Sequence, residues 1–358
     1  MFVAWRDLRF AKGRFALMGT VIVLITLLVG LLSGLTAGLA RENVSAITGL
    51  PADRIAFAAP PAGQSVSFTR STVTGKQEDA WAERPGVTGA APLGISTLNA
   101  VAGERTAAVS AFGTEPGDGL APAPVAPGKA VLSESAAEEL GARAGDAVRL
   151  GPLEVRVSAV AGDASYSHTP VVWTSLGDWR RLGHGGATAE EGATVLALRG
   201  DGVDWAAGDA AAGTEARTVD DALTAIGSYQ AENGSLQLMR GFLFVISALV
   251  IGAFFTVWTI QRSGDVAVLK ALGASTPYLL RDALGQAVLM LVAGTLLGTG
   301  LALGIGALVS GGDVPFVLSP STVLGPAGVI IALGAIGSAL SIRRITAVDP
   351  LTALGSVR

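Results

Sequence analysis

The chain has 358 residues, of which 50% are hydrophobic and 15% charged, and its formal net charge is −4. This composition is too apolar for an ordinary soluble protein and too polar for one that lies entirely in a membrane. It therefore predicts several membrane spans and a water-exposed domain. Cysteine is absent, which excludes a disulfide framework, a thiolate metal site and a cysteine nucleophile.

The first apolar run covers residues 15–40 and carries no charged side chain. A helix of this length crosses the roughly 30 Å hydrocarbon core of a bilayer at about 1.5 Å rise per residue. The basic segment before it, residues 1–14, would suit a signal peptide. However, the run is longer than the roughly 7–15-residue apolar part of such a peptide, and no clear A-x-A cleavage site follows it. We therefore predict an uncleaved first span.

Three further spans are predicted in the C-terminal third of the chain. They cover residues 239–261, 283–309 and 323–342. Each must be helical, because lipid offers no hydrogen-bond partner to an unpaired backbone group.

Lys and Arg near the ends of spans favour the cytoplasmic side of a membrane. Residues 1–14, 262–282 and 343–358 together hold ten basic and four acidic residues, whereas residues 41–238 are rich in acidic ones. Both termini are therefore expected in the cytoplasm of a bacterial cell. Residues 41–238 and the short loop 310–322 are expected outside the cell membrane.

Residues 41–238 are predicted to form an α+β domain inserted between the first two of four transmembrane helices. Strands are expected at Arg54–Ala58, Ser65–Thr69, Ala147–Leu150, Glu154–Val160, Val171–Trp173 and Thr194–Leu198. Ser135 and Glu138 have the spacing of a capping box, and Gly141 is placed to end that helix. A second helix is expected to begin at Asp220. The Gly- and Pro-rich stretch Thr114–Gly128 predicts a mobile loop.

Several motifs of catalysis are missing from the sequence. No G-x-x-x-x-G-K-[ST] phosphate loop is present, so the chain is not predicted to hydrolyse ATP. The two histidines, His168 and His184, lack the spacing of metal ligands. We therefore expect neither an enzyme nor a metal site, and no nucleic-acid partner.

The segment 262–282 predicts a short helix on the cytoplasmic side. Asp265 can begin it, apolar side chains recur at Val266, Leu269 and Leu272, and Gly273 can end it. Periodicity alone favours a helix that lies on the lipid surface. The other interpretation is a docking helix for a cytoplasmic partner.

Two motifs on the cytoplasmic side resemble the FtsX/MacB family of ABC transporter permeases: V-L-K-A-L-G-A-S at 268–275 and R-R-I-T-A-V-D-P-L-T-A-L at 343–354. The outer stretch 130–148 is also similar to that family. The resemblance implies a homodimer that binds two copies of a separate ATPase, which holds ATP and magnesium, while this chain binds no cofactor itself. It further implies that a coupling segment contacts the ATPase, with Asp265, Val266, Leu269, Lys270, Leu272 and Gly273.

A stripe of glycines, Gly30, Gly34 and Gly38, lies on one face of the first predicted span. Such a face lets two helix backbones approach closely. Packing within one subunit and a seam between two subunits are both open interpretations.

The start of the chain, residues 2–15, and the segment 166–173 resemble the heme-efflux subgroup of this family, so heme or another hydrophobic molecule is the expected cargo. An iron ligand and a cation for the propionates are needed. The candidates are Tyr229, Tyr166 and His168 as ligands, and Arg70 and Arg240 as cations. For each, a surface or core position without a ligand role is the alternative. Two other functions compete with heme export. The chain could transmit force to an extracellular cell-wall hydrolase, or it could export antimicrobial peptides or lipophilic drugs.

Overall fold

The computed structural model describes residues 12–183, 192–261, 264, 268–270, 272–309, 314–317 and 319–346. The chain forms two compact units. We call Leu39–Gly234 the outer domain, and Met1–Gly38 together with Ser235–Arg358 the helical unit.

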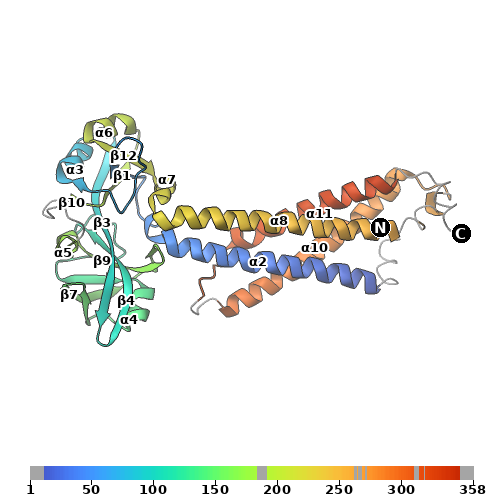
Figure 1. Cartoon of the computed structure of the whole chain (residues 1–358), viewed down its shortest axis with the longest axis horizontal. Helices are drawn as coiled ribbons and strands as arrows, with labels where there is room; N and C mark the ends of the chain where they lie inside the picture. The colour runs from blue at the N-terminus through green and yellow to red at the C-terminus, as the bar shows by residue number, and fades with distance from the viewer. Residues whose placement is uncertain are drawn as a thin grey trace. The chain divides into compact units, whose positions relative to one another are not determined.

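Four long helices carry the apolar segments of the chain (Figure 1). They are α2 (Lys12–Thr48), α8 (Gly227–Gln261), α10 (Thr276–Val309) and α11 (Pro320–Thr346). Within the described part of the chain, each holds a stretch that is long and apolar enough to cross a membrane. The prediction of four membrane helices is confirmed.

The helical unit packs around a small apolar centre to which all four helices contribute. Ile22 and Val29 of α2, Ile251 and Phe255 of α8, Leu291 of α10 and Ile330 of α11 are almost completely buried there. Most other large apolar side chains of these helices are exposed in the single subunit, as expected for surfaces that face lipid or another protein in a membrane.

The outer domain contains twelve described strands and several short helices. The strands are β1 (Arg54–Ala58), β2 (Val73–Thr74), β3 (Val87–Ala102), β4 (Arg105–Thr114), β5 (Lys129–Leu132), β6 (Ala147–Leu150), β7 (Leu153–Val160), β8 (Ser165–Tyr166), β9 (Thr169–Ser175), β10 (Gly192–Ala193), β11 (Val195–Gly200) and β12 (Thr214–Thr218). The helices are α3 (Gly75–Ala82), α4 (Glu134–Leu140), α5 (Leu176–Arg181), α6 (Trp205–Ala212), α7 (Val219–Ala222) and the 3₁₀ turn η1 (Leu223–Ala225).

The long hairpin of β3 and β4 organises the outer domain (Figure 1). The main sheet has the strand order β12-β1-β11-β3-β4-β9-β5-β7-β6. Because β6 also pairs with β3, the six strands β3, β4, β9, β5, β7 and β6 close into a ring. β2 and β10 form a separate small sheet. The main sheet mixes antiparallel pairs with the parallel pairs β4–β9 and β5–β7. This architecture is α+β, as the sequence predicts.

Alternating side chains fill three cores of the outer domain, one of them around the buried Trp81 of α3. Val109, Leu132, Leu150 and Val172 are among the residues packed with α4 in another core. The third core is aromatic, with Phe57, Phe68, Phe112, Tyr166 and Trp173 beside apolar residues from the C-terminal end of α2.

Five of the six predicted strands are confirmed, whereas Ser65–Thr69 is wrong: this stretch forms turns, with Arg70 N–H donating to the Ser67 carbonyl. The cap of α4 is also corrected. Ser133, not Ser135, accepts the Ala136 N–H, while Ser135 Oγ donates to Asp163 at 2.5 Å. Gly141 does end this helix, at φ 62°.

The predicted helix from Asp220 is shorter than expected. The helix α7 begins at Val219, one residue before the predicted start, and Thr218 caps it. The chain becomes extended at Ile226 before α8 begins. Thr114 still belongs to β4, while the rest of the predicted loop, up to Gly128, has no regular structure; Leu120 and Val125 anchor it in the aromatic core.

Candidate functional site

The glycine stripe of α2 is covered within the subunit. A Cβ on Gly30 would lie 2.9 Å from the Ala302 Cβ of α10. A Cβ on Gly34 would collide with the Phe316 ring, and one on Gly38 with the Pro315 carbonyl. In addition, the Val317 N–H donates to the Gly34 carbonyl at 3.1 Å. This face of α2 therefore packs inside one subunit.

α10 meets α2 through small residues of its own. A Cβ on Gly298 would lie 2.6 Å from the Val23 carbonyl oxygen and 2.7 Å from the Thr26 Cβ. Gly294 lies equally close to Ile22. Missing Cβ atoms on both helices thus permit close backbone contact, the small-residue packing common in membranes.

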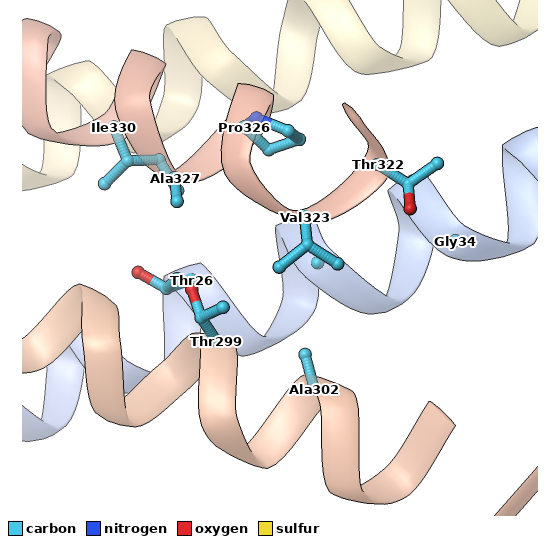
Figure 2. Close-up of a pocket in the computed structure, with 10 residues that line it drawn as sticks. Thr26, Gly34, Thr299, Ala302, Thr322, Val323, Pro326, Ala327 and Ile330 are labelled. Atoms are coloured by element: carbon cyan, nitrogen blue, oxygen red, sulfur yellow. The ribbon is translucent and has the colours of Figure 1, made fainter. Parts of the chain in front are cut away.

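A cavity of about 10 Å³ lies between α2, α10 and α11 (Figure 2). Its lining includes Thr26 and Gly30 of α2, Thr299 of α10 and Pro326 of α11. This volume has room for about one water molecule. It is far too small for a large flat ligand.

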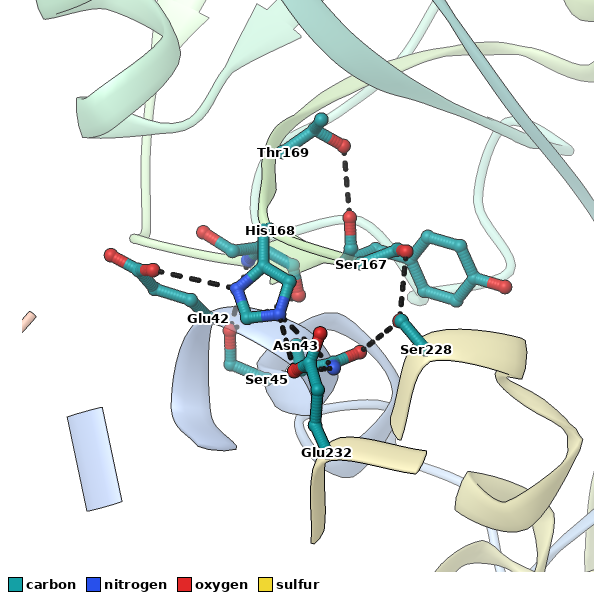
Figure 3. A network of polar contacts seen from close by, with 10 residues as sticks. Glu42, Asn43, Ser45, Ser167, His168, Thr169, Ser228 and Glu232 are labelled. Atoms are coloured by element: carbon teal, nitrogen blue, oxygen red, sulfur yellow. Dashed lines mark hydrogen bonds and ion pairs between the residues drawn. The ribbon is translucent and has the colours of Figure 1, made fainter. Parts of the chain in front are cut away.

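A polar network lies where α2 ends and α8 begins in the outer domain (Figure 3). His168, in the two-residue loop between β8 and β9, has its Nε2 2.7 Å from Glu232 Oε2 of α8. Its Nδ1 lies 3.7 Å from Glu42 Oε2 of α2. One imidazole therefore faces a carboxylate from each helix.

Asn43 is the buried centre of this network, with 1% of its surface exposed. Its Nδ2 donates to Glu232 Oε2 at 3.0 Å, and its Oδ1 accepts from Ser228 Oγ at 3.1 Å. Ser167 Oγ lies 3.1 Å from Ser228 Oγ. Both ends of the Asn43 amide are hydrogen-bonded, which a buried amide needs.

Tyr166 and His168 lie in the same hairpin but have different surroundings. The Tyr166 side chain is buried, with edge-to-face contacts to Phe68 and Phe112 at 5.8 and 5.7 Å between ring centroids. Burial raises the pKa of its phenol above the ordinary value of 10.0. The structure therefore places Tyr166 in the core, where its phenol is poorly accessible to a ligand.

Replacing Tyr166 with phenylalanine is expected to reduce the loss of stability in alkali. A pKa that is raised in the folded state gives stability that is present below about pH 10 and is lost as the pH rises. The variant lacks this titration, so its thermal midpoint should fall less than that of the wild type between pH 9 and 11. Tyr278→Phe, which alters an exposed tyrosine, is the control. Equal alkaline losses in wild type and Tyr166→Phe would contradict the expectation.

The other predicted cargo residues are spread over different surfaces. Tyr229 follows Ser228 on α8 and is partly buried against the aromatic core. Arg70 is exposed, and its guanidinium donates to Gln64 Oε1 and to the Ser65 carbonyl. Arg240 lies further along α8, in the helical unit, and is partly exposed. Of the cargo candidates, His168 takes part in the polar network through its side chain.

The predicted coupling segment is partly described. Asp265 and Val266 lie outside the described residues. Gly273 has φ 96°, and its N–H donates to the Lys270 carbonyl while the Ala274 N–H donates to the Leu269 carbonyl, which is the expected helix end. Leu272 is 80% exposed.

Glu42, Asn43, Ser228 and Glu232 were not singled out in the sequence. The available signal was Glu42-Asn43 immediately after the first apolar run, since polar residues at that point need partners. Their partners are distant in the chain, and only the fold brings them together.

The order of elements, one membrane helix, an outer α+β domain and three more membrane helices, is that of a multi-pass membrane protein with a large domain between its first two membrane helices. A family model described as the MacB-like periplasmic core domain matches residues 15–226, and one described as the FtsX-like permease C-terminal matches residues 238–350. The chain belongs to the FtsX/MacB family of ABC transporter permeases. An ABC permease of this kind works with a partner ATPase.

Relatives of the same length support this assignment. The chain is 28% identical to "Putative hemin transport system permease protein HrtB" of Staphylococcus haemolyticus over 100% of both chains. It is 25% identical to "Uncharacterized ABC transporter permease Rv2563" of Mycobacterium tuberculosis over 99% of both. Among solved structures, the periplasmic region of MacB from Actinobacillus actinomycetemcomitans matches with a TM-score of 0.37 and 11% identity, covering 49% of this chain and 92% of that one.

Proposed function

We propose that the protein is the membrane subunit of an ATP-driven exporter that extrudes heme, or another hydrophobic molecule, from the bacterial cell membrane. Two copies of this chain would bind two copies of a separate cytoplasmic ATPase. The observation that carries the choice of cargo is the end-to-end similarity to a relative named for hemin transport.

His168 and Tyr229 are the cargo contacts that we retain. His168 is about one-third exposed, and its imidazole is a known type of iron ligand. Tyr229 follows Ser228 at the start of α8 and packs, partly buried, against the aromatic core. Arg70 and Arg240 stay as candidate cations for the propionates.

The cargo space is proposed to lie between two copies of the chain. The cavity between α2, α10 and α11 has only about 10 Å³, whereas pockets for drug-sized ligands measure roughly 300–1,000 Å³. The exposed apolar residues of α8, such as Phe242 and Leu249, would provide the apolar walls that heme requires.

Hemin titration of the purified permease in detergent, followed by the Soret band, tests the cargo. We expect saturable binding that Tyr229→Phe weakens. Tyr166→Phe should bind like the wild type because its phenol is in the core, and the exposed Tyr278→Phe is a second control. Absence of saturable binding would refute the heme assignment and favour a force transmitter to a cell-wall hydrolase. Binding that is unaffected by Tyr229→Phe would refute only this ligand.

Leu272→Asp is expected to release the partner ATPase. Leu272 is 80% exposed in the single subunit, and loss of an apolar anchor from an interface costs about 2 kcal/mol or more, which is about thirtyfold in affinity. The amount of ATPase that co-purifies with the permease measures this effect. Ser275→Asp is the control, since it places the same charge at an exposed polar position of the same segment. Undiminished co-purification of the Leu272 variant would exclude this residue from the contact.

A further inference from the structure

The loop between β8 and β9 has an unusual backbone for its sequence. Ser165 pairs with Pro170 and Tyr166 with Thr169, so Ser167 and His168 form a two-residue hairpin loop. Both have positive φ, 49° and 62°. Loops of this geometry favour Asn and Gly, because other side chains are strained in the left-handed region. The hairpin pairing itself requires this conformation, and contacts outside the loop help to hold it.

Those contacts all lead to two helices. The Ser167 N–H donates to the Asn43 carbonyl at 2.9 Å, and the His168 N–H donates to the Glu42 carbonyl at 3.3 Å, both on α2. The side chains of the loop reach α8, since His168 Nε2 contacts Glu232 and Ser167 Oγ contacts Ser228. Figure 3 shows the loop lying against both helix ends. The loop thus fastens the end of α2 to the start of α8.

We propose that the Ser167–His168 loop is a releasable connection between the end of α2 and the start of α8, which we call the buckle. Opening it breaks only a few polar contacts and leaves the pairs between β8 and β9 in place. Water can replace the lost hydrogen bonds, because the side chains of His168 and Glu232 are 31% and 43% exposed. An apolar joint would have neither property. Strained backbone conformations of this kind concentrate in elements that switch between two states.

The distance between the two helices tests the buckle in the permease alone. The chain has no native cysteine, so Arg41→Cys on α2 and Gln230→Cys on α8, both exposed, accept spin labels specifically. We expect one short-distance population in the otherwise wild-type protein. His168→Ala removes the bond to Glu232 but keeps the strained backbone, and should raise the ratio of long- to short-distance molecules about tenfold.

His168→Gln is the conservative rescue. The glutamine amide nitrogen can reach about the position of the imidazole Nε2 and donate to Glu232, so the short distance should return. A merely space-filling histidine would not be replaced by the acyclic glutamine in this way. Identical distance distributions in the wild type and His168→Ala would overturn the buckle.

A second arm adds the partner ATPase and ATP, and it rests on the proposed function. ATP should raise the long-distance population of the protein with wild-type His168, if opening is part of the transport cycle. A complex that hydrolyses ATP without any change in this distance would overturn release during the cycle. A complex without ATPase activity would count against the proposed function, while the measurement on the permease alone would still decide the buckle.

Discussion

Gly298→Val in α10 is expected to abolish the accumulation of correctly folded permease. The new Cβ would lie 2.6 Å from the Val23 carbonyl oxygen of α2, which is backbone and cannot rotate away. Overpacking of a tight contact costs about 3 kcal/mol when the neighbour cannot adjust. Fluorescence-detected size-exclusion chromatography of the detergent extract should show a loss of the monodisperse peak, and the thermal midpoint of any remaining material should fall.

Gly300→Val provides the matched control for this prediction. Gly300 lies two residues further along the same helix, and nothing comes within 4 Å of the position its Cβ would occupy. Both variants make the same chemical change in an apolar helix. They differ only in whether the new side chain points at α2 or into open space. Equal behaviour of the two variants would contradict the close α2–α10 contact.

Asn43→Leu is expected to lower the free energy of unfolding of the outer domain by about 3 kcal/mol. The substitution removes the donor to Glu232 and the acceptor for Ser228 at a position that is only 1% exposed. The loss of one hydrogen bond to a carboxylate and one to a hydroxyl accounts for a cost of this size. For a domain of this size, the change corresponds to a decrease of roughly 10 °C in the thermal midpoint, measured on the purified full chain.

Asn99→Leu separates this effect from the general cost of a leucine. Asn99 is an exposed residue of β3, and surface substitutions of that kind stay within about 0.5 kcal/mol. A thermal midpoint of Asn43→Leu as high as that of Asn99→Leu would show that the network contributes little to stability.

Strong, local patterns made much of the fold predictable. The apolar runs specify membrane helices because lipid leaves no other backbone arrangement, and Gly141 marks a helix end because only glycine adopts its conformation cheaply. The β3–β4 hairpin was missed, although it is the longest in the domain. Its strands are rich in Ala, Gly, Ser and Thr, so they lack the β-branched alternation by which strands are recognised.

The candidate site was less predictable because it depends on contacts between distant residues. Sequence places Tyr166 and His168 two positions apart, but the hairpin turns one into an aromatic core and the other toward Glu42 and Glu232. Likewise, the spacing of Gly30, Gly34 and Gly38 indicates close packing without identifying the neighbour. Ala302, Pro315 and Phe316 cover this face, which only the three-dimensional structure reveals.

The position of β1 in the main sheet has a consequence for biogenesis. β1 comes first in the outer domain, yet both of its neighbours, β11 and β12, come near its end. During synthesis, this strand must wait outside the membrane until nearly the whole domain has been translocated, with its backbone groups unpaired. Non-local pairing of this kind is slow and leaves an edge open to aggregation. The outer domain should therefore depend on extracytoplasmic chaperones during export, and truncations after β9 should be degraded rather than assembled into the membrane.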